Sequence, residues 1–240
     1  MKIAVLFFVY IYAKIKQNKK VYYMNSKIKP IILSVKRSQF RMDDPKAEHS
    51  DSEFKELRNK IKERDDYTCF YCNFRAFQYQ EVHHINDNHG NNSESNLTTI
   101  CPICHGCKHI GLSGLDEKGF LIYYPNISQV NLNIIIKTVW VGIESEDKDI
   151  KNHCQNIIDK FYELKDVADE KLTSDPATLS TLLLDMNEEE YKNRQKKLKN
   201  FILVPRIEAY KKQSRYWAEE VFKGTPSSEW LKIAKKIQKC

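Results

Sequence analysis

Four of the seven cysteines form two identical short motifs. Cys69 and Cys72 enclose two residues, as do Cys101 and Cys104, and residues 73–100 separate the two pairs. Two such knuckles bring four thiolates to one tetrahedral zinc ion and close its coordination shell. A site of this kind stabilises a fold and carries out no chemistry. The spacing therefore predicts a structural Zn²⁺ site made of these four cysteines.

Cys107 follows the second motif by three residues. It is either a spare thiol or a replacement for a neighbouring ligand, and both interpretations stay open. Cys154 and Cys240 complete the set, and the spacings outside the two motifs match no disulfide framework. This usage of cysteine favours a reducing compartment.

The sequence between the two motifs predicts a β-hairpin that carries an adjacent pair of histidines. The strand QEVHHI contains His83 and His84, the loop spans residues 87–95, and NLTTI returns over residues 96–100. A helix that begins near Pro102 then crosses the hairpin. The region therefore reads as a ββα unit built between and onto the cysteine motifs.

At these residues the chain resembles the HNH, or ββα-metal, nuclease motif. The resemblance implies that His83 is a metal ligand and that His84 is the general base. It implies that Asn96, which precedes a leucine, ties the loop so that the base points inward. It also implies that His105, directly after the second knuckle, is the remaining metal ligand.

These residue types suit the hydrolysis of a phosphodiester. A neutral imidazole accepts a proton from water near neutral pH. A second divalent ion, Mg²⁺ or another, on His83 and His105 would stabilise the charge that builds on the scissile phosphate. His89 and His109 receive no role and are expected at the surface. The motif predicts the nuclease-type fold, and its use in cleavage stays open.

Hydrophobic periodicity and capping residues predict the elements that hold the motif. Asp51 or Ser52 begins a helix that ends near Arg64, just before the first cysteine. Residues 27–40 read as a short strand followed by an irregular stretch. Residues 111–119 are expected to form a loop or turn, and FLIYYP at 120–125 an apolar strand that the proline ends.

The pattern after Pro125 is mostly helical. The expected elements are an apolar helix capped by Ser128, an amphipathic helix over about 150–164, a helix from Pro176, a charged helix over 188–200, an apolar connection FILVP, and helices near 206–223 and 228–239. The predicted class is α+β: an HNH-type ββα-metal zinc module (24–110) with an N-terminal helix, then a mostly α-helical C-terminal region (111–240) packing on it.

A second resemblance covers roughly residues 31–230. The segments IKERDDYTCFYCNFRAFQYQEV, NNSESNLTTICPICHGC and FLIYYPNISQVNLNIII, and more loosely LVPRIEAYKKQSRYW, are similar to the IcmJ/DotN proteins. These are accessory subunits of type IVB secretion systems and related conjugation systems. A generic HNH nuclease would not share the parts outside the motif.

This resemblance implies an assembly subunit of a cytoplasmic coupling complex, located at the inner face of the membrane through that complex. Its partners would be a coupling ATPase and adaptor proteins, and its zinc would be structural. The secretion members are degenerate at the His-His and post-knuckle His positions, whereas His83, His84 and His105 are present here. DNA chemistry therefore stays an alternative.

Net charge and the N-terminus add weaker constraints. The formal net charge of +7 is compatible with nucleic acid or an acidic partner, but abundant lysine throughout gives the same total. The apolar run at residues 3–12 is too short to span a bilayer, which takes about 20 residues. Residues 1–23 are either an untranslated extension before Met24 or a signal-like or tethering segment.

Three functions fit these observations. The favoured one is an accessory subunit of a type IVB coupling complex with structural zinc. The alternative is an active, metal-dependent HNH endonuclease that acts on DNA, and the third is a zinc module that binds nucleic acid without catalysis. Aromatic residues around the first knuckle (Phe70, Tyr71, Phe74, Phe77 and Tyr79) are expected in the core of the module.

Overall fold

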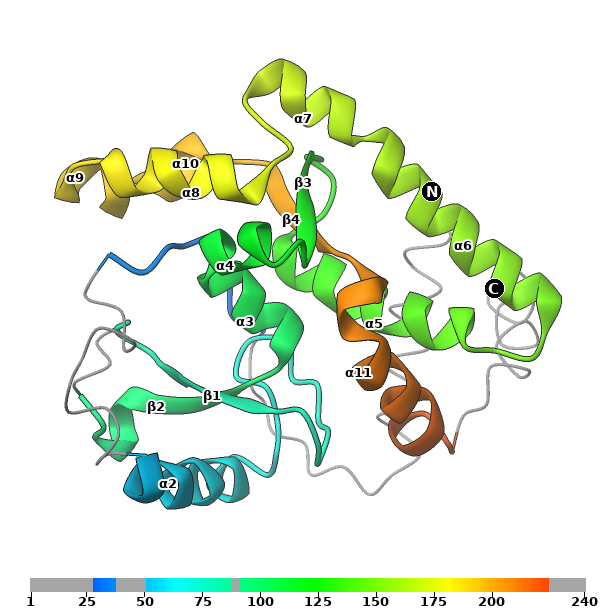
Figure 1. The fold of residues 1–240 in the computed structure, drawn as a ribbon, viewed down its shortest axis with the longest axis horizontal. Helices are drawn as coiled ribbons and strands as arrows, with labels where there is room; N and C mark the ends of the chain where they lie inside the picture. The colour runs from blue at the N-terminus through cyan, green and yellow to red at the C-terminus, as the bar shows by residue number, and fades with distance from the viewer. Residues whose placement is uncertain (1–27, 38–50, 88–90, 225–240) are drawn as a thin grey trace.

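The computed structural model describes residues 28–37, 51–87 and 91–224 (Figure 1). Residues 1–23, His89, Cys240 and the helix expected at 228–239 lie outside the described residues. The described elements are α2 (Asp51–Arg64), β1 (Glu81–His84), η2 (Glu94–Asn96), β2 (Leu97–Ile100), α3 (Pro102–Lys108), α4 (Ile110–Leu115), β3 (Gly119–Tyr123), α5 (Gln129–Ile143), α6 (Lys148–Glu163), α7 (Lys165–Lys171), α8 (Pro176–Asp185), α9 (Glu188–Lys192), α10 (Arg194–Lys197), β4 (Phe201–Pro205), η3 (Ile207–Tyr210), α11 (Lys211–Tyr216) and η4 (Trp217–Val221).

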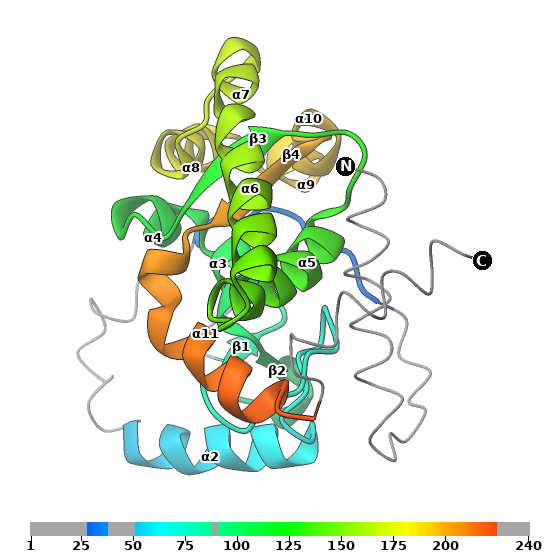
Figure 2. The same cartoon turned by 90° about the vertical axis from the view of Figure 1, so that its right-hand side faces the viewer.

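The predicted ββα unit is present. β1 and β2 pair antiparallel, with Glu81 opposite Ile100 and His84 opposite Leu97. Helix α2 lies along one side of this hairpin and α3 begins directly after it (Figures 1 and 2). Ile61 of α2 packs on Leu97 in a small core of its own. The predictions of the hairpin, of α2 and of the helix after Cys101 are confirmed.

The C-terminal region contains a second sheet that the sequence analysis missed in part. FILVP, expected as a connection, is strand β4, which pairs antiparallel with β3 so that Phe201 lies opposite Tyr123 and Pro205 opposite Gly119. An apolar run this short looks the same as a strand or a connection, because both faces are buried and no alternation appears. Pro205 lies at the end of this pairing, where its missing N–H removes no hydrogen bond from the middle of the strand.

Helix α5 lies at the centre of the main core. Ser128 caps it as predicted, its side chain accepting a hydrogen bond from the Asn131 N–H. Nearly every residue from Gln129 to Gly142 is buried, which is typical of a helix enclosed by protein on all sides. Its Trp140 stacks on Tyr210 and on Trp217. The core that surrounds α5 includes the knuckle cysteines, so one apolar cluster spans both proposed parts of the chain.

The helices flanking α5 begin close to where the sequence placed them. Asp147 caps α6 and Asp175 caps α8, with proline at the first helical position of α8. The charged helix expected over 188–200 is instead two short helices, α9 and α10, separated by Asn193. None of the helices within the described residues is long and apolar enough to cross a membrane.

Residues 28–37 form no strand, contrary to the prediction. The backbone of Ser34 instead donates to the Cys107 carbonyl oxygen and accepts from the Ile110 N–H, so the segment is fixed at the junction of α3 and α4. Arg194 donates to the Leu33 carbonyl oxygen from the far side. Distant helix ends supply these partners, and local sequence carries no sign of them.

Two of the aromatic side chains at the first knuckle are exposed. Tyr71 and Phe74 are buried in the core, as expected. Phe77 is 58% exposed and packs on Tyr67, and Tyr79 reaches across to Tyr216. The expectation of a wholly buried aromatic cluster is therefore wrong for Phe77 and Tyr79.

The loop expected at 111–119 contains helix α4, and its glycines explain the difference. α4 packs on α8 so closely that a Cβ on Gly114 would lie 2.3 Å from the Ala177 backbone nitrogen. A Cβ on Gly111 would meet the Ser180 side chain at 3.1 Å. The glycines are thus typical of a close helix–helix contact, whereas in sequence they indicate a turn.

Replacing Gly114 by alanine tests this packing. Alanine favours a helix over glycine by about 1 kcal/mol, but here the backbone of α8 must move, which costs about 1–3 kcal/mol. We expect Gly114→Ala to lower the midpoint of thermal unfolding in a circular dichroism melt. Gly224→Ala is the control, since a Cβ there meets nothing within 4 Å. An unchanged or raised midpoint for Gly114→Ala would contradict the close contact.

Candidate metal centres

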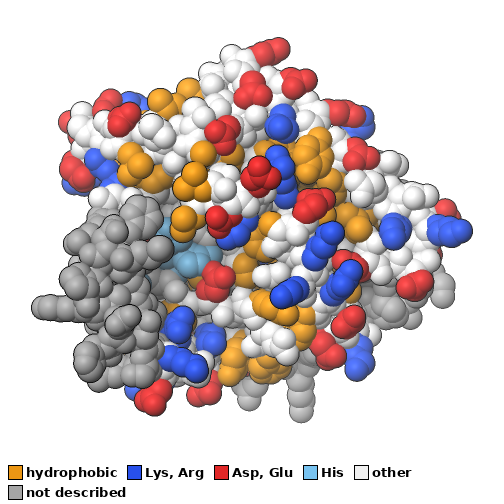
Figure 3. All heavy atoms as spheres, viewed as in Figure 1, with side chains coloured by type: hydrophobic (Ala, Val, Ile, Leu, Met, Phe, Trp, Pro, Cys, Tyr) orange, Lys and Arg blue, Asp and Glu red, His pale blue; other side chains and the backbone are white. Residues whose placement is uncertain are grey.

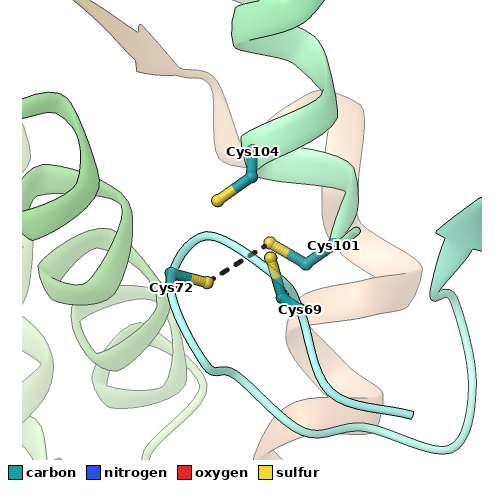
Figure 4. A group of neighbouring side chains, drawn as sticks. All are labelled: Cys69, Cys72, Cys101 and Cys104. Carbon is teal, nitrogen blue, oxygen red and sulfur yellow. Dashed lines mark hydrogen bonds between the residues drawn. The ribbon is translucent and has the colours of Figure 1, made fainter. Parts of the chain in front are cut away.

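The two knuckles converge on one point. The sulfurs of Cys69, Cys72, Cys101 and Cys104 all lie within 4.8 Å of one another, and all four residues are fully buried. Figure 4 shows the four side chains directed toward a common centre, two from a loop and two from the start of α3. The Sγ atoms of Cys72 and Cys101 are 3.7 Å apart, too far for a disulfide.

The first knuckle is a tight turn held by backbone hydrogen bonds. The Cys69 N–H donates to the Phe74 carbonyl oxygen and the Asn73 N–H donates to the Cys69 carbonyl oxygen. Asn73 has φ 56°, in the left-handed region that asparagine tolerates better than most residues. Gln80 closes the loop by donating to the carbonyl oxygens of Tyr67 and Phe74.

The second knuckle is the first turn of α3. Cys101 is the N-cap in an extended conformation, which the following Pro102 favours, and Cys104 lies within the first turn. One cysteine before the helix and one inside it therefore face the same point. The helix start thus fixes two of the four sulfurs.

The cluster fits a metal ion. Tetrahedral ligation with metal–sulfur bonds of about 2.3 Å places sulfurs about 3.8 Å apart, close to the distance between Cys72 and Cys101. Burial raises the pKa of Cys69 and Cys104 well above that of a free thiol, because the interior solvates an anionic sulfur poorly. A bound cation supplies the positive charge that keeps such groups ionised.

Cys107 differs from these four residues. Its sulfur donates to the Ile103 carbonyl oxygen of the preceding turn at 3.5 Å, and it is not part of the four-sulfur group. Burial raises the pKa of Cys107 to about 12, so its thiol is protonated. Of the two interpretations left open by the sequence, the geometry favours the spare thiol.

Three histidines form a second cluster beyond the cysteines. The ligand atoms of His83, His105 and His109 lie within 4.8 Å of one another. Their ring centroids are 5.3 Å apart for His83 and His105, 5.8 Å for His83 and His109, and 4.7 Å for His105 and His109. His83 is buried on β1, while the other two, at the end of α3, are half-buried. Histidine side chains reach the surface on the face drawn in Figure 3.

The charges around the histidine cluster favour a neutral His83. Burial, together with the neighbouring His105 and Lys108, lowers the pKa of His83 to about 2, so its ring keeps a lone pair for a metal. Within the described residues, His83 Nε2 is buried without a hydrogen-bond partner, 3.5 Å from Asp87 Oδ1. Glu81 pairs with His105 Nδ1. A carboxylate on a histidine ring orients it toward a metal and raises its basicity.

His84 and Asn96 lie next to this cluster and not in it. His84 Nε2 is 2.9 Å from Asn92 Oδ1 in the hairpin loop. Asn96 Oδ1 accepts from the Asn86 N–H at 3.2 Å, and its amide donates to the Asn91 carbonyl oxygen at 2.9 Å. Asn96 thus ties the two ends of the loop together, which is the arrangement that the HNH resemblance implies.

Sequence reasoning missed His109. The structure brings together His83 and His105, the two predicted ligands of a second ion, and adds His109, which was expected at the surface. The signal was available: His105 and His109 are four residues apart, so a helix places both on one face. The sequence predicts the short helix from Pro102, but its C-terminal end at residue 109 depends on spacing that the HNH resemblance does not include.

Comparisons with known proteins agree with this geometry. The family model of the HNH endonucleases matches residues 69–111. The chain is also 34% identical over 178 residues to the type 4 apparatus protein DotN of Legionella pneumophila, a match that covers 72% of this chain and 82% of DotN. The chain belongs to the DotN family. Because the HNH match is far shorter than 178 residues, most of the similarity to DotN lies outside the metal centres.

Serine substitutions distinguish the metal ligands from the spare thiol. We expect Cys104→Ser to lose the metal of the four-cysteine centre and to unfold at a much lower temperature, since structural zinc supplies folding free energy. Cys107→Ser, the matched control on the same helix, should keep one metal ion at that centre. Metal content by plasma mass spectrometry, with a thermal melt, measures both. Loss of that ion from Cys107→Ser would make Cys107 a ligand.

Proposed function

We propose that this DotN-family protein is an accessory subunit of a type IVB secretion or conjugation apparatus. The observation that carries the proposal is the 34% identity to a type 4 apparatus protein over 72% of the chain. A nuclease needs only the ββα unit and its substrate contacts. Similarity that extends through the helical region is expected of a subunit whose surfaces are used in assembly.

We place the protein in the cytoplasm, at the inner face of the membrane through its complex, with a coupling ATPase and adaptor proteins as partners. None of the six described cysteines forms a disulfide, in keeping with a reducing compartment. The proposed ion in the four-cysteine centre is Zn²⁺, because four thiolates at tetrahedral spacing are its preferred structural ligands. Such a centre would hold the subunit in its assembly-competent fold.

The packed pair α4 and α8 offers a surface for assembly. Leu115 of α4 is 75% exposed, and Leu182 and Leu184 of α8 are also exposed. Single exposed leucines are common, and Leu182 and Leu184 lie on different sides of α8 because they are two residues apart. We propose that exposed leucines on both packed helices contribute to a surface that a partner covers. Figure 3 shows hydrophobic side chains gathered on this face.

Co-purification from cells that carry the secretion apparatus tests the assembly role. We expect the tagged full-length protein to retain the coupling ATPase, and Leu115→Asp with Leu182→Asp to reduce that retention at least several-fold, because a charge cannot be buried unpaired. Ile28→Asp, an exposed apolar residue outside α4 and α8, is the control. Failure of the unmodified protein to retain any coupling ATPase would count against the proposal.

A second candidate function, cleavage of DNA, is favoured by one observation. His83, His105 and His109 can offer three nitrogen ligands to a divalent ion, with His84 and Asn96 beside them. Three ligands leave a coordination position open for water or substrate, which a structural centre lacks. The four cysteines supply no such position.

The roles of the residues in this candidate follow from their contacts. A bound divalent ion would stabilise the charge that develops on a scissile phosphate. His84 would take the proton from the attacking water, with Asn92 fixing its ring. Asn96 keeps the loop ends in place, and Glu81 orients His105. The lysine next to the cluster, Lys108, is 3.7 Å from Asp87 and keeps that carboxylate near His83.

Nicking of supercoiled plasmid measures this activity. We expect cleavage only with added Mg²⁺, Mn²⁺ or Ni²⁺, abolished in His84→Ala and in His109→Ala and retained in His153→Ala, an exposed histidine on α6. His109→Ala should keep the metal of the four-cysteine centre. Absence of cleavage by folded, metal-loaded protein would reject the nuclease and leave the assembly role untouched.

A further inference from the structure

Three polar residues interrupt the apolar sequence of α5 at intervals of four. Gln129, Asn133 and Lys137 lie on one face of the helix, and Asn133 and Lys137 are fully buried. A buried amide without partners is costly and a buried lysine more so, and lysine is almost never fully buried unless paired. Their presence in the central helix of the core therefore needs partners of comparable strength.

The partners are the sulfurs of the four-cysteine centre. Lys137 Nζ lies 3.5 Å from Cys72 Sγ, and Asn133 Nδ2 lies 3.3 Å from Cys104 Sγ. The Asn133 amide is also 3.7 Å from Cys107 Sγ. Each knuckle thus receives one donor from the same helix of the C-terminal region.

A chain of hydrogen bonds fixes these donors. Gln129 Nε2 donates to Asn133 Oδ1 at 2.9 Å, so the Asn133 amide nitrogen must face the sulfurs. Gln129 itself is held by the backbone of Leu203 on β4, to which it donates and from which it accepts. Lys137 Nζ also donates to the Asn133 carbonyl oxygen at 2.9 Å. Strand β4 therefore fixes the Asn133 amide through Gln129, while the helix backbone holds the Lys137 amine.

The charge on Lys137 faces sulfur atoms, and no carboxylate of the described residues balances it. Among the described residues no Asp or Glu forms an ion pair with this amine, and its other neighbour is the Phe74 ring, 5.2 Å from Nζ. Four thiolates around one divalent ion carry an excess of negative charge. An ammonium beside Cys72 and a negative metal–thiolate cluster therefore compensate each other inside the core.

We infer that Gln129, Asn133 and Lys137 form the outer shell of the four-cysteine metal centre, with Lys137 offsetting the excess negative charge of its thiolates. This inference rests on the proposed metal at that centre. It makes α5 part of the metal centre, so that the ββα unit and the helical region depend on the same ion. Thiolates that accept hydrogen bonds from such outer-shell donors hold the metal more tightly and therefore release it more slowly.

Lys137→Met tests the inference, because methionine is an unbranched side chain only one atom shorter than lysine and lacks both the charge and the donor. We expect metal release to a chromogenic chelator to be about tenfold faster or more than in the unmodified protein. In Co²⁺-loaded protein, the sulfur-to-metal charge-transfer band should move to lower energy, since the sulfur electrons lose a stabilising charge. Asn133→Leu should have the same effects to a smaller degree.

The control is Thr138→Val, a buried neighbour whose hydroxyl bonds within α5 to the Ile134 carbonyl oxygen. It tests destabilisation of the helix without loss of a sulfur contact. If Lys137→Met and Asn133→Leu release metal as slowly as Thr138→Val, with an unmoved band, the outer-shell role is overturned. Unmodified protein without any metal would instead overturn the metal centre itself.

A measurement on the unmodified protein covers the case in which the variants do not fold. Hydrogen exchange of the α5 amides should rise when a chelator removes the metal, together with that of α3. Helix α5 that keeps its protection while α3 opens would overturn the inference, because the helix would then be stable without the ion that its polar face contacts.

Discussion

The structure depends on four sulfurs that meet in the core, out of contact with the solvent. Burial raises the pKa of Cys69 and Cys104 well above that of a free thiol. At Cys72 and Cys101, burial is outweighed by hydrogen bonds from the neighbouring thiols, which lower the pKa of both. Four thiolates this close repel one another, and a bound cation makes the cluster favourable. The same point joins a loop, the start of α3 and, through Asn133 and Lys137, the central helix α5. The strands β1 and β2 and helix α3 are short, and none of them would be stable alone. The metal centre therefore fixes one point within the apolar core that spans both parts of the chain.

The short helix α3 positions ligands of both candidate metal centres. Cys101 and Cys104 are in its first turn, and His105 and His109 lie on a face that meets His83 of the hairpin. Thiolates select a soft structural ion, whereas imidazoles with an open position accept an ion that still exchanges ligands. Because both sets share one short helix, loss of the four-cysteine centre would also remove the histidine cluster, while loss of a histidine leaves the cysteines in place. The histidine cluster is thus the part that can vary without loss of the fold.

The sequence predicted what local spacing determines. The Cys-x-x-Cys pairs, the hairpin between them, the cap of α5 by Ser128 and the start of α8 at Pro176 are encoded within a few residues, and the structure has them. The prediction from sequence failed where an element depends on a partner that is distant in the chain. FILVP is a strand only because β3 lies beside it, the glycines of α4 form a helix only because Ala177 lies against them, and residues 28–37 are fixed by the ends of helices far along the chain. Nothing in the sequence near Lys137 indicates that its amine contacts Cys72, which is 65 positions away.

Membership of the DotN family and a complete set of HNH residues are compatible in physical terms. The HNH match ends at residue 111, yet the core continues without a break through β3, α5 and β4, which bury the knuckle cysteines. The ββα unit therefore shares its core with the helical region. Fold alone does not determine function, because a site can be kept or lost while the scaffold is retained. Here the four cysteines and α5 hold the scaffold, and the histidines add contacts within the ββα unit, His84 with Asn92 and His105 with Glu81. We propose that their presence together around one point, with Glu81 and Asp87 beside them, reflects binding of a cation.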